Sequence, residues 1–554
     1  MEYDNTTVGV TKRVGSWERR YPTMPIDPQH LVSALREFIS TAPDEPFVEF
    51  EGQWWTAARF AAIGAGLAGL LDEAEVPPAI AVGVVVRNHV ETAAAIVGLV
   101  AAGRPVTMIY SYQSPELIAA SVEKLALGVV VAEDADWTAE LRAAVTNEDR
   151  IGIALPAGMG QPYRVDENKT LRAGCREHGE TLVEVLTSGT TGAPKHIPLR
   201  VSALVRGVDM ITVAASASAD PQIEILFAPL PSIGGILTLL AYPLVGARFS
   251  LLERFDVDKW TDTIRRNRPR SIGCTPAMVR SVLERNVPAE AFESVEVVYG
   301  GAGPIEVETR QKFAETYGVD FCWGYGATEF AGTVAAWTPR LKAELGGDRP
   351  NSVGRPVPGV QVRITDPETG AELSTDQVGR LEVLIPSVSP EWSVTNDQAK
   401  LDSDGVLYIF GRLDGAINRG GFKVLPELVA ETLRRHPAVK DAGVIGIADS
   451  RLGEIPVAAV ELLPGNEAVD GEELRKFARS HLPSPSVPAA VVVVETLPRN
   501  MTLKIDLVAL RRICEAHVAQ QAGASRDVPL PDRPAGNGDP GGSRPAAAFA
   551  VSPD

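Results

Sequence analysis

The chain has 554 residues, 45% apolar and 22% charged, and its 71 acidic against 53 basic side chains give a formal net charge of −18. This length and composition predict a soluble protein of several domains with a large core. The acidic balance repels polyphosphates and argues against nucleic-acid binding, so an anionic ligand must be met by a local cluster of donors.

The spacing of cysteines and histidines and the composition of the N-terminal segment argue against several further classes of protein. No C-x-x-C or H-E-x-x-H spacing occurs, so neither a zinc site nor a disulfide framework is expected. The N-terminal stretch MEYDNTTVGVTKR has no apolar run of signal-peptide type, and the apolar segments are too short to span a bilayer. We therefore expect a cytoplasmic protein without a membrane span.

From residue 80 the chain alternates between buried-strand and helix patterns, which predicts an α/β fold with parallel strands covered by helices. A similar alternation returns after residue 223. The expected strands are 80–86, 105–110, 127–134, 224–230 and 247–253, and the expected helices are 89–103, 114–126 and 234–246.

The pattern changes near Gly411, where a compact α+β unit of about 100 residues begins. The last segment is rich in Pro, Gly and Ala, which is typical of disorder. We therefore expect a flexible N-terminus at 1–22, a large domain at 23–411, a small domain at 412–516 and a disordered tail at 520–554.

The segment TSGTTGAPK, Thr187–Lys195, concentrates hydroxyls, glycines and one lysine directly after a strand-like run. Such a loop suits a phosphate cradle, but its composition alone also fits a surface turn. It is not a Walker A loop, because Gly189 and Gly192 are three residues apart and Pro194 precedes the lysine.

Together with five later segments, this loop resembles the signature of the adenylate-forming superfamily. That superfamily includes acyl-CoA synthetases, aryl-acid ligases and peptide-synthetase adenylation domains. Over about residues 25–515, the resemblance implies a large multi-sheet α/β domain followed by a small mobile α+β lid. The later segments are GYGATE (324–329), SVGRPVPGV (352–360), TND (395–397), GRLDGAINRGGFKVLP (411–426) and LPRNMTLKIDLVAL (497–510).

The resemblance implies a reaction in two halves. A carboxylate attacks the α-phosphate of Mg·ATP and gives an acyl-adenylate and pyrophosphate, and a nucleophile then displaces AMP. The first step joins two anions, so catalysis depends on positioning and charge neutralisation. The implied catalytic residues are Lys504, Thr328 and Glu329, and Glu329 is also the implied magnesium ligand.

The implied nucleotide site draws on several segments. In it Tyr325 stacks on adenine, Asp397 accepts from both ribose hydroxyls, and Arg412 contacts ribose and phosphate. The complete implied set is Thr187, Ser188, Gly189, Thr190, Thr191, Gly192, Lys195, Gly301, Ala302, Gly303, Tyr325, Gly326, Asp397 and Arg412.

The implied acid site and hinge are less specific. Ser232 and nearby glycines leave room, which favours an aromatic or bulky acid over acetate. Asp414, followed by a glycine, stands where the lid of the family swivels. The implied acid-site residues are Ser232, Gly234, Gly235, Gly300, Trp323 and Gly324.

The sequence departs from the family pattern mainly in the lid. Leu503 replaces the glycine before the implied catalytic lysine, so we expect that turn to lack glycine's freedom at positive φ. Leu428 and Ala430 replace two acids, Asn396 replaces a glycine, and His196 replaces the glycine after the loop lysine. The first half-reaction is therefore better supported than the second.

The resulting hypothesis is an AMP-forming acid–CoA ligase that uses ATP, Mg²⁺ and CoA. Arg419 and Lys423 are the nearest candidates for contacting the 3′-phosphate of CoA. One alternative is a ligase that transfers the acyl group to a carrier protein in trans, an amine or another nucleophile. Another is a catalytically inactive nucleotide-binding protein.

Overall fold

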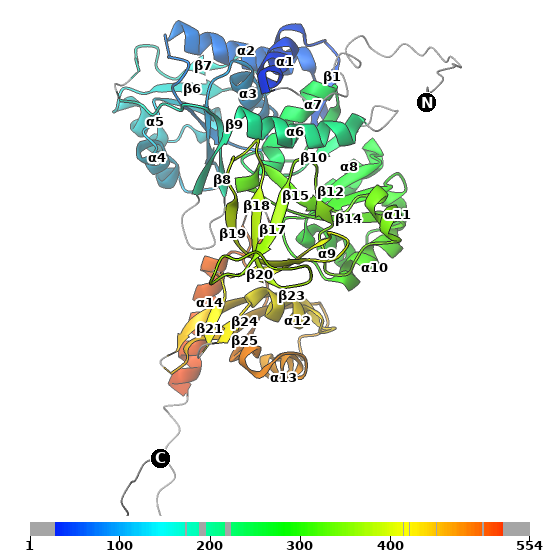
Figure 1. Cartoon of the computed structure of the whole chain (residues 1–554). Coiled ribbons are helices and arrows are strands. Elements are labelled where there is room, and N and C mark those ends of the chain that lie inside the picture. The colour runs from blue at the N-terminus through cyan, green and yellow to red at the C-terminus, as the bar shows by residue number, and fades with distance from the viewer. Residues whose placement is uncertain are drawn as a thin grey trace, which may run out of the picture.

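In the computed structural model, we call the described residues from 28 to 413 the body and the smaller part from 415 to 524 the lid. Figure 1 shows the lid elements gathered at one end of the molecule, next to strand β20 (Leu407–Arg412) of the body. The described residues are 28–171, 174–187, 195–216, 223–413, 415–419, 422–449, 451–500 and 503–524.

The first sheet of the body has the strand order β7-β6-β5-β3-β4-β8-β9. Its inner strands pair in parallel, as the alternating sequence pattern predicts, and its two edge strands are antiparallel. The strands are β3 (Val82–Val86), β4 (Val106–Tyr110), β5 (Val129–Glu133), β6 (Ile151–Leu155), β7 (Tyr163–Arg164), β8 (Thr181–Thr187) and β9 (Lys195–Arg200).

Helix α3 lies in the centre of the body and is buried along its whole length. It crosses α2 at a glycine pair, where a Cβ added to Gly98 would lie 2.2 Å from the Cα of Gly64. Only glycine permits so close a contact between two helix backbones. The helices of this region are α1 (Pro28–Thr41), α2 (Ala57–Glu73), α3 (Val90–Ala101), α4 (Pro115–Lys124) and α5 (Ala139–Thr146).

Two further sheets continue the body. The first has the order β10-β11-β1-β2, and the second runs β12-β13-β14-β15-β16. The strands of these two sheets are β1 (Pro46–Phe50), β2 (Gln53–Thr56), β10 (Ile223–Leu226), β11 (Arg248–Leu251), β12 (Ser271–Cys274), β13 (Val297–Gly300), β14 (Asp320–Ala327), β15 (Gly332–Ala336) and β16 (Arg355–Pro356). The helices of this region are α6 (Val201–Ser216), α7 (Ile233–Val245), α8 (Val257–Asn267), α9 (Pro276–Glu284), α10 (Val307–Tyr317) and α11 (Pro339–Leu345).

The last sheet of the body is an antiparallel meander that ends beside the lid. Its apolar face packs around Phe330 and Leu381 in a separate small core. This sheet carries Asp397 and Arg412 on its last two strands. The strands are β17 (Gln361–Thr365), β18 (Gly379–Leu384), β19 (Ser393–Leu401) and β20 (Leu407–Arg412).

The lid is a sheet in the order β22-β21-β24-β23, with β25 parallel to β24. Helix α12 packs closely on β23, and α14 packs on both β23 and β24. The elements are β21 (Ile417–Arg419), β22 (Phe422–Val424), α12 (Pro426–Arg434), β23 (Val439–Asp449), β24 (Gly453–Leu462), α13 (Gly471–His481), β25 (Ala490–Val494) and α14 (Leu507–Ala524).

Two terminal segments bear on the sequence prediction. Helix α14 continues to Ala524, four residues beyond the point where the disordered tail is expected to begin. The segments 1–22 and 525–554 lie outside the described residues. No helix in the described part of the chain is long and apolar enough to cross a membrane.

Candidate active site

The predicted magnesium ligand lies on a short turn at the end of β14. Strand β14 pairs with β15, and a Cβ on Gly326 would lie 2.4 Å from the carbonyl oxygen of Gly332. This glycine is therefore fixed by a close approach of two backbones. The 3₁₀ turn Thr328–Phe330 follows at once and leaves the Glu329 side chain exposed to solvent, with Phe330 buried behind it.

Three predicted nucleotide contacts lie together in the body. The hydroxyl of Tyr325 donates a hydrogen bond to a carboxylate oxygen of Asp397. Burial, and then the charge of Asp397, raise the pKa of Tyr325, so the phenol stays protonated. Asp397 and Arg412 are paired residues on β19 and β20. The ladder thus brings together a donor, a carboxylate and a guanidinium, which match the groups of a nucleoside phosphate.

The predicted catalytic lysine lies in a tight turn of the lid between β25 and α14. Asn500 and Lys504 exchange two bonds, one from the Asn500 N–H to the Lys504 carbonyl at 2.8 Å and one from the Lys504 N–H to Asn500 Oδ1 at 3.1 Å. The Lys504 side chain still reaches solvent, but surrounding protein atoms displace part of its hydration. This burial lowers its pKa, and the carboxylate of Glu329 opposes the shift. The Lys504 ammonium of the lid is therefore close enough to the Glu329 carboxylate of the body for the two charges to interact, although 175 positions separate them in the chain.

Leu503 corrects an expectation about this turn. The loss of the family's glycine predicts a turn that cannot use glycine's freedom at positive φ, but Leu503 itself has φ 61°. A left-handed residue with a Cβ costs roughly 1–2 kcal/mol. Its side chain packs against a hydrophobic cluster of the body that includes Trp323. A contact between lid and body therefore accompanies the strained backbone.

The predicted phosphate loop joins β8 to β9, whose ends are paired at Thr187 and Lys195. Residues 188–194 lie outside the described residues, and with them the predicted phosphate contacts Ser188, Gly189, Thr190, Thr191 and Gly192. The side chain of Thr187 also lies outside the described part of the chain. The buried carboxylate of Glu184 supports the base of the loop. It accepts bonds from Arg176 at 2.8 Å and from Thr107 at 3.1 Å.

His196, the departure that follows the loop lysine, lies 3.7 Å from Glu184 through Nδ1. Burial lowers the pKa of His196, although the charge of Glu184 opposes this. The sequence did not indicate this polar cluster, because its members come from β4, β8, β9 and the segment before β8.

The predicted acid site is less open at two positions than the sequence suggested. The hydroxyl of Ser232 caps helix α7, accepting from the Gly235 N–H at 3.2 Å and donating to the Pro229 carbonyl at 2.6 Å. A Cβ on Gly235 would lie 2.1 Å from that same carbonyl oxygen. Gly234 has only the side chain of Ala228 within 4.0 Å, so it leaves open space.

A similar correction applies to Gly300. Its neighbour Trp323 lies on the adjacent strand β14, and a Cβ on Gly300 would lie 2.0 Å from the indole ring. Trp323 is buried and stacks on Phe321 at 5.7 Å between ring centroids. The space that Gly300 leaves is therefore filled by protein rather than open to a flat ligand.

The loop after β13 remains exposed next to β14. Gly301 approaches Gly324 so closely that a Cβ would lie 3.2 Å from its carbonyl oxygen. Ala302 has φ 69°, and Gly303 is exposed beside it. The loop that is predicted to border adenine therefore lies in the same region as the strand that carries Tyr325.

The junction between body and lid contains a residue that the sequence analysis did not single out. The predicted hinge, Asp414, lies outside the described residues. Gly411 has φ 134°, and a Cβ there would lie 3.1 Å from the carboxylate of Glu427 at the start of α12. Burial raises the pKa of Glu427, while Arg412 opposes the shift. Glycine at 411 thus permits a lid acid to approach the last strand of the body.

The predicted contacts to the acceptor are only partly described. The Arg419 guanidinium donates to the carbonyls of Pro485 and Val487 at 2.8 and 2.9 Å, so it is engaged within the lid. The Lys423 side chain lies outside the described residues.

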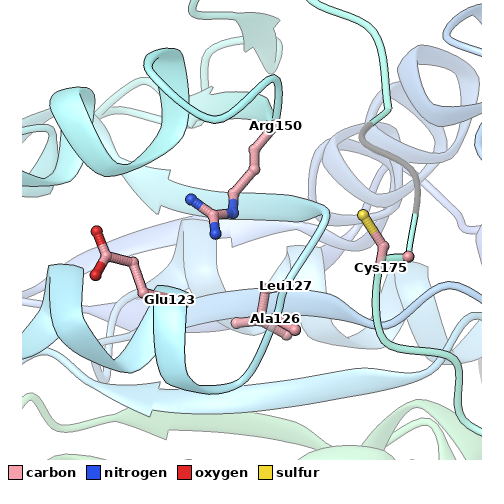
Figure 2. Close-up of a pocket in the computed structure, with 6 residues that line it drawn as sticks. Glu123, Ala126, Leu127, Arg150 and Cys175 are labelled. Atoms are coloured by element: carbon pink, nitrogen blue, oxygen red, sulfur yellow. The ribbon is translucent and has the colours of Figure 1, made fainter.

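A small cavity lies between the end of α4 and the residues just before β5 and β6. Figure 2 shows Glu123, Arg150 and Cys175 around it, with Arg150 reaching in from the start of β6. Its volume is about 110 Å³, and none of the predicted site residues lines it. The described residues contain no group of three or more His, Cys, Asp or Glu arranged to hold a metal ion. Among the described residues, Glu329 therefore stays the predicted magnesium ligand, a single carboxylate that oxygens of a bound nucleotide would supplement.

Comparisons with known proteins identify the family of the chain. The family model described as "AMP-binding enzyme" matches residues 35–391, and the model of its C-terminal domain matches 429–504. A long-chain-fatty-acid–CoA ligase from Bacillus subtilis is 24% identical, covering 88% of this chain and 96% of that protein.

Two solved structures share the fold. One is O-succinylbenzoate coenzyme A synthetase (MenE) from Bacillus subtilis in complex with ATP and magnesium, with TM-score 0.70 and 23% identity over 87% of this chain and 99% of that one. The other is the amide bond synthetase McbA from Marinactinospora thermotolerans, with TM-score 0.71 and 26% identity over the same shares. The family models cover most of the chain in both of its parts, and the chain belongs to the family of AMP-binding enzymes.

Proposed function

We propose that this enzyme activates a carboxylic acid with Mg·ATP as an acyl-adenylate, releases pyrophosphate, and then transfers the acyl group to CoA. The observation that carries the proposal is the hydrogen bond from Tyr325 to Asp397, with Arg412 paired to Asp397 on the next strand. The charge of Lys504 on the lid also interacts with that of Glu329 on the body. A cation and an exposed carboxylate beside a Tyr–Asp–Arg set fit the joining of a carboxylate to a nucleoside triphosphate.

Each charged group has a proposed task in the first half-reaction. The Lys504 ammonium balances negative charge that builds up between the attacking carboxylate and the α-phosphate. Glu329 supplies a carboxylate oxygen for Mg²⁺, which neutralises phosphate charge when bound. Thr328, in the same turn, donates to the α-phosphate. A lid docked over these residues excludes water from them and strengthens their interactions with the substrates.

The nucleotide and acid contacts are proposed from the same framework. Asp397 accepts from the ribose hydroxyls, Tyr325 lies against adenine, and Arg412 contacts ribose and phosphate. The loop Gly301–Gly303 borders adenine and the acid, and residues 187–192 with Lys195 hold the terminal phosphates. Among the predicted acid contacts, Gly234 fits best, because it leaves open space.

CoA is proposed as the acceptor because a relative that aligns with almost its whole length is a CoA ligase. An amine acceptor is the second candidate, favoured by the amide bond synthetase that shares the fold at 26% identity. Arg419 donates through Nη1 to backbone carbonyls of the lid, which makes it a weaker candidate for the CoA 3′-phosphate and supports keeping the amine alternative.

The test is a panel of carboxylic acids assayed for pyrophosphate release, with CoA, with an amine, or with neither. We expect acid-dependent pyrophosphate and AMP, and an acyl-CoA detectable by mass spectrometry. Lys504→Ala should abolish most of the signal, whereas Lys476→Ala, an exposed lid lysine, should not. Steady ADP without AMP would contradict adenylation, and adenylate that yields amide but no thioester would select the amine acceptor.

A further inference from the structure

Five charged side chains meet in the interface between body and lid, and we call them the interdomain charge cluster. The body contributes Arg280 from α9 and Glu306 at the start of α10. The lid contributes Arg434 from α12, Asp441 from β23 and Arg499 from the turn before α14. The side chains of Glu306, Arg434 and Asp441 are only 6%, 8% and 3% exposed.

The contacts of the cluster cross the interface in both directions. Arg434 of the lid forms an ion pair with Glu306 of the body through Nε and Oε1. Arg280 of the body lies 3.1 Å from both oxygens of Glu306 and 3.7 Å from Asp441 of the lid. Arg434 also lies 3.5 Å from Asp441. Each carboxylate therefore faces arginines from both parts of the chain.

Both carboxylates are ionised in this arrangement. Burial opposes ionisation, but Arg434 and Arg280 lower the pKa of Glu306. Burial likewise opposes the ionisation of Asp441, and Arg280, Arg434 and Arg499 lower its pKa. Removing Arg434 would break the buried ion pair that joins the lid directly to Glu306 of the body and leave that carboxylate with Arg280 alone, which disfavours the docked arrangement.

The cluster continues directly into the turn that carries the catalytic lysine. Arg499 donates to Asp441 at 2.6 Å through Nη2 and to the carbonyl of Leu503 at 3.0 Å through Nη1. Leu503 precedes Lys504, and Asn500 closes the same turn. A continuous path of polar contacts thus runs from Glu306 and Arg280 of the body to the backbone beside Lys504.

We propose that the interdomain charge cluster is a positioning device that holds the lid, and with it Lys504, in the adenylate-forming orientation. The inference rests on the proposed function and adds to it five residues that touch neither nucleotide nor acid. Reorientation of the lid for acyl transfer must separate Arg434 from Glu306 and Arg280 from Asp441. The cluster therefore favours adenylation and delays transfer.

A second ion pair across the interface is weaker. Lys440 of the lid lies 2.8 Å from Glu284 of the body, but these side chains are 25% and 27% exposed. Partly exposed pairs contribute little because water and salt screen them. The buried cluster is therefore the part of the interface to test.

The kinetic test uses Arg434→Gln in the full chain, alone and combined with Lys504→Ala. We expect Arg434→Gln to slow single-turnover adenylate formation about tenfold or more while it spares acyl transfer from a supplied acyl-adenylate. In the Lys504→Ala background the same substitution should cost almost nothing further, because it acts through that lysine. Equal loss in both half-reactions, or undiminished loss without Lys504, would overturn the proposal.

A matched control separates positioning from stability. Arg104 is buried within the body, where it bonds the carbonyl of Val76 at 2.9 Å and Asp72 at 2.7 Å. Arg104→Gln removes a similarly buried guanidinium far from the lid and should leave the ratio of the two half-reaction rates unchanged. A shift in this ratio equal to that of Arg434→Gln would overturn the assignment.

A distance measurement needs no acid substrate. Spin labels at the exposed positions 290 of the body and 472 of the lid report the lid orientation with Mg·ATP added. We expect one dominant distance in the parent chain and a broader or second population after Arg434→Gln, and an unchanged distribution would overturn the proposal. If no acid in the panel supports pyrophosphate release while the distances change as expected, the proposed function fails and the holding role of the cluster stands.

Discussion

The body and the lid fix their site residues by different means. In the body, Tyr325, Asp397 and Arg412 lie on hydrogen-bonded strands whose register sets their spacing. In the lid, Lys504 lies on a turn held by Arg499, which also contacts Asp441, and Asp441 in turn lies 3.7 Å from Arg280 of the body. Residues on strand ladders are preformed, whereas residues on a docked unit depend on how that unit is held. We therefore expect that substitutions can alter nucleotide binding and the adenylation step separately.

The largest expected effect comes from removing the lid's ammonium. Lys504→Ala should slow adenylate formation about 100–1000-fold, corresponding to about 3–4 kcal/mol of transition-state stabilisation. It should spare transfer from a supplied acyl-adenylate and leave ATP binding by the body largely intact. Rapid-quench measurement of each half-reaction, with equilibrium binding of ATP, checks this. Equal loss in both half-reactions would make Lys504 structural and erase the contrast between the two parts.

The hinge prediction concerns Asp414, which lies outside the described residues. Asp414→Pro should fix φ near −65° where the backbone has to adopt two states. We expect one half-reaction to persist while steady-state turnover falls at least tenfold. Asp404→Pro, at the exposed turn between β19 and β20, provides a control for proline insertion. Normal turnover and normal half-reactions in Asp414→Pro would move the swivel point elsewhere.

A smaller effect is expected at Leu503, where strain and contact compete. Its side chain packs on the body only while the lid is docked, but its left-handed φ is a property of the turn itself. Partial burial of a leucine contributes about 1 kcal/mol, or about fivefold. Leu503→Ala and Leu503→Gly should therefore lower the ratio of adenylation to transfer by a similar factor. Only the glycine variant should also raise the thermal stability of the lid, since it alone removes the strain. A changed ratio in just one variant would contradict this assignment.

The smallest effect at neutral pH is expected from the titration of Lys504. Burial lowers its pKa below the ordinary lysine value of about 10.4, and Glu329 limits the shift. The protonated form is the active one, so adenylation is complete below this pKa and is lost as pH rises through it. Lys504→Arg, with whatever activity it retains, should lack this alkaline limb because arginine stays charged. A pH–rate profile of single-turnover adenylation checks this, with circular dichroism to exclude unfolding. If Lys504→Arg shows the same loss of adenylation at alkaline pH, that loss belongs to the titration of another group.

The sequence predicted the parallel sheet well and the acid site less well, for one physical reason. The runs that form β3, β4 and β5 are continuous apolar strands separated by helices, and such a local pattern has essentially one packing solution. The room around Gly300 and Gly235 depends on what neighbouring segments place there. The indole of Trp323 and the carbonyl of Pro229 fill those spaces, and no local pattern reports that.

The order of the motifs in the sequence indicated the family, the two-part architecture and the candidate residues Glu329, Asp397 and Lys504. The sequence could indicate them because the chemistry requires those residue types in short contiguous segments. Only the tertiary structure decided how the lid meets the body. The arginines and acids of the interdomain charge cluster come from five separate segments and form no spacing pattern in the chain. Leu503 likewise reads as a lost glycine in the sequence and becomes a contact only when the body lies against it. Buried charge pairing and docking are long-range properties, so they emerge only after the chain has folded.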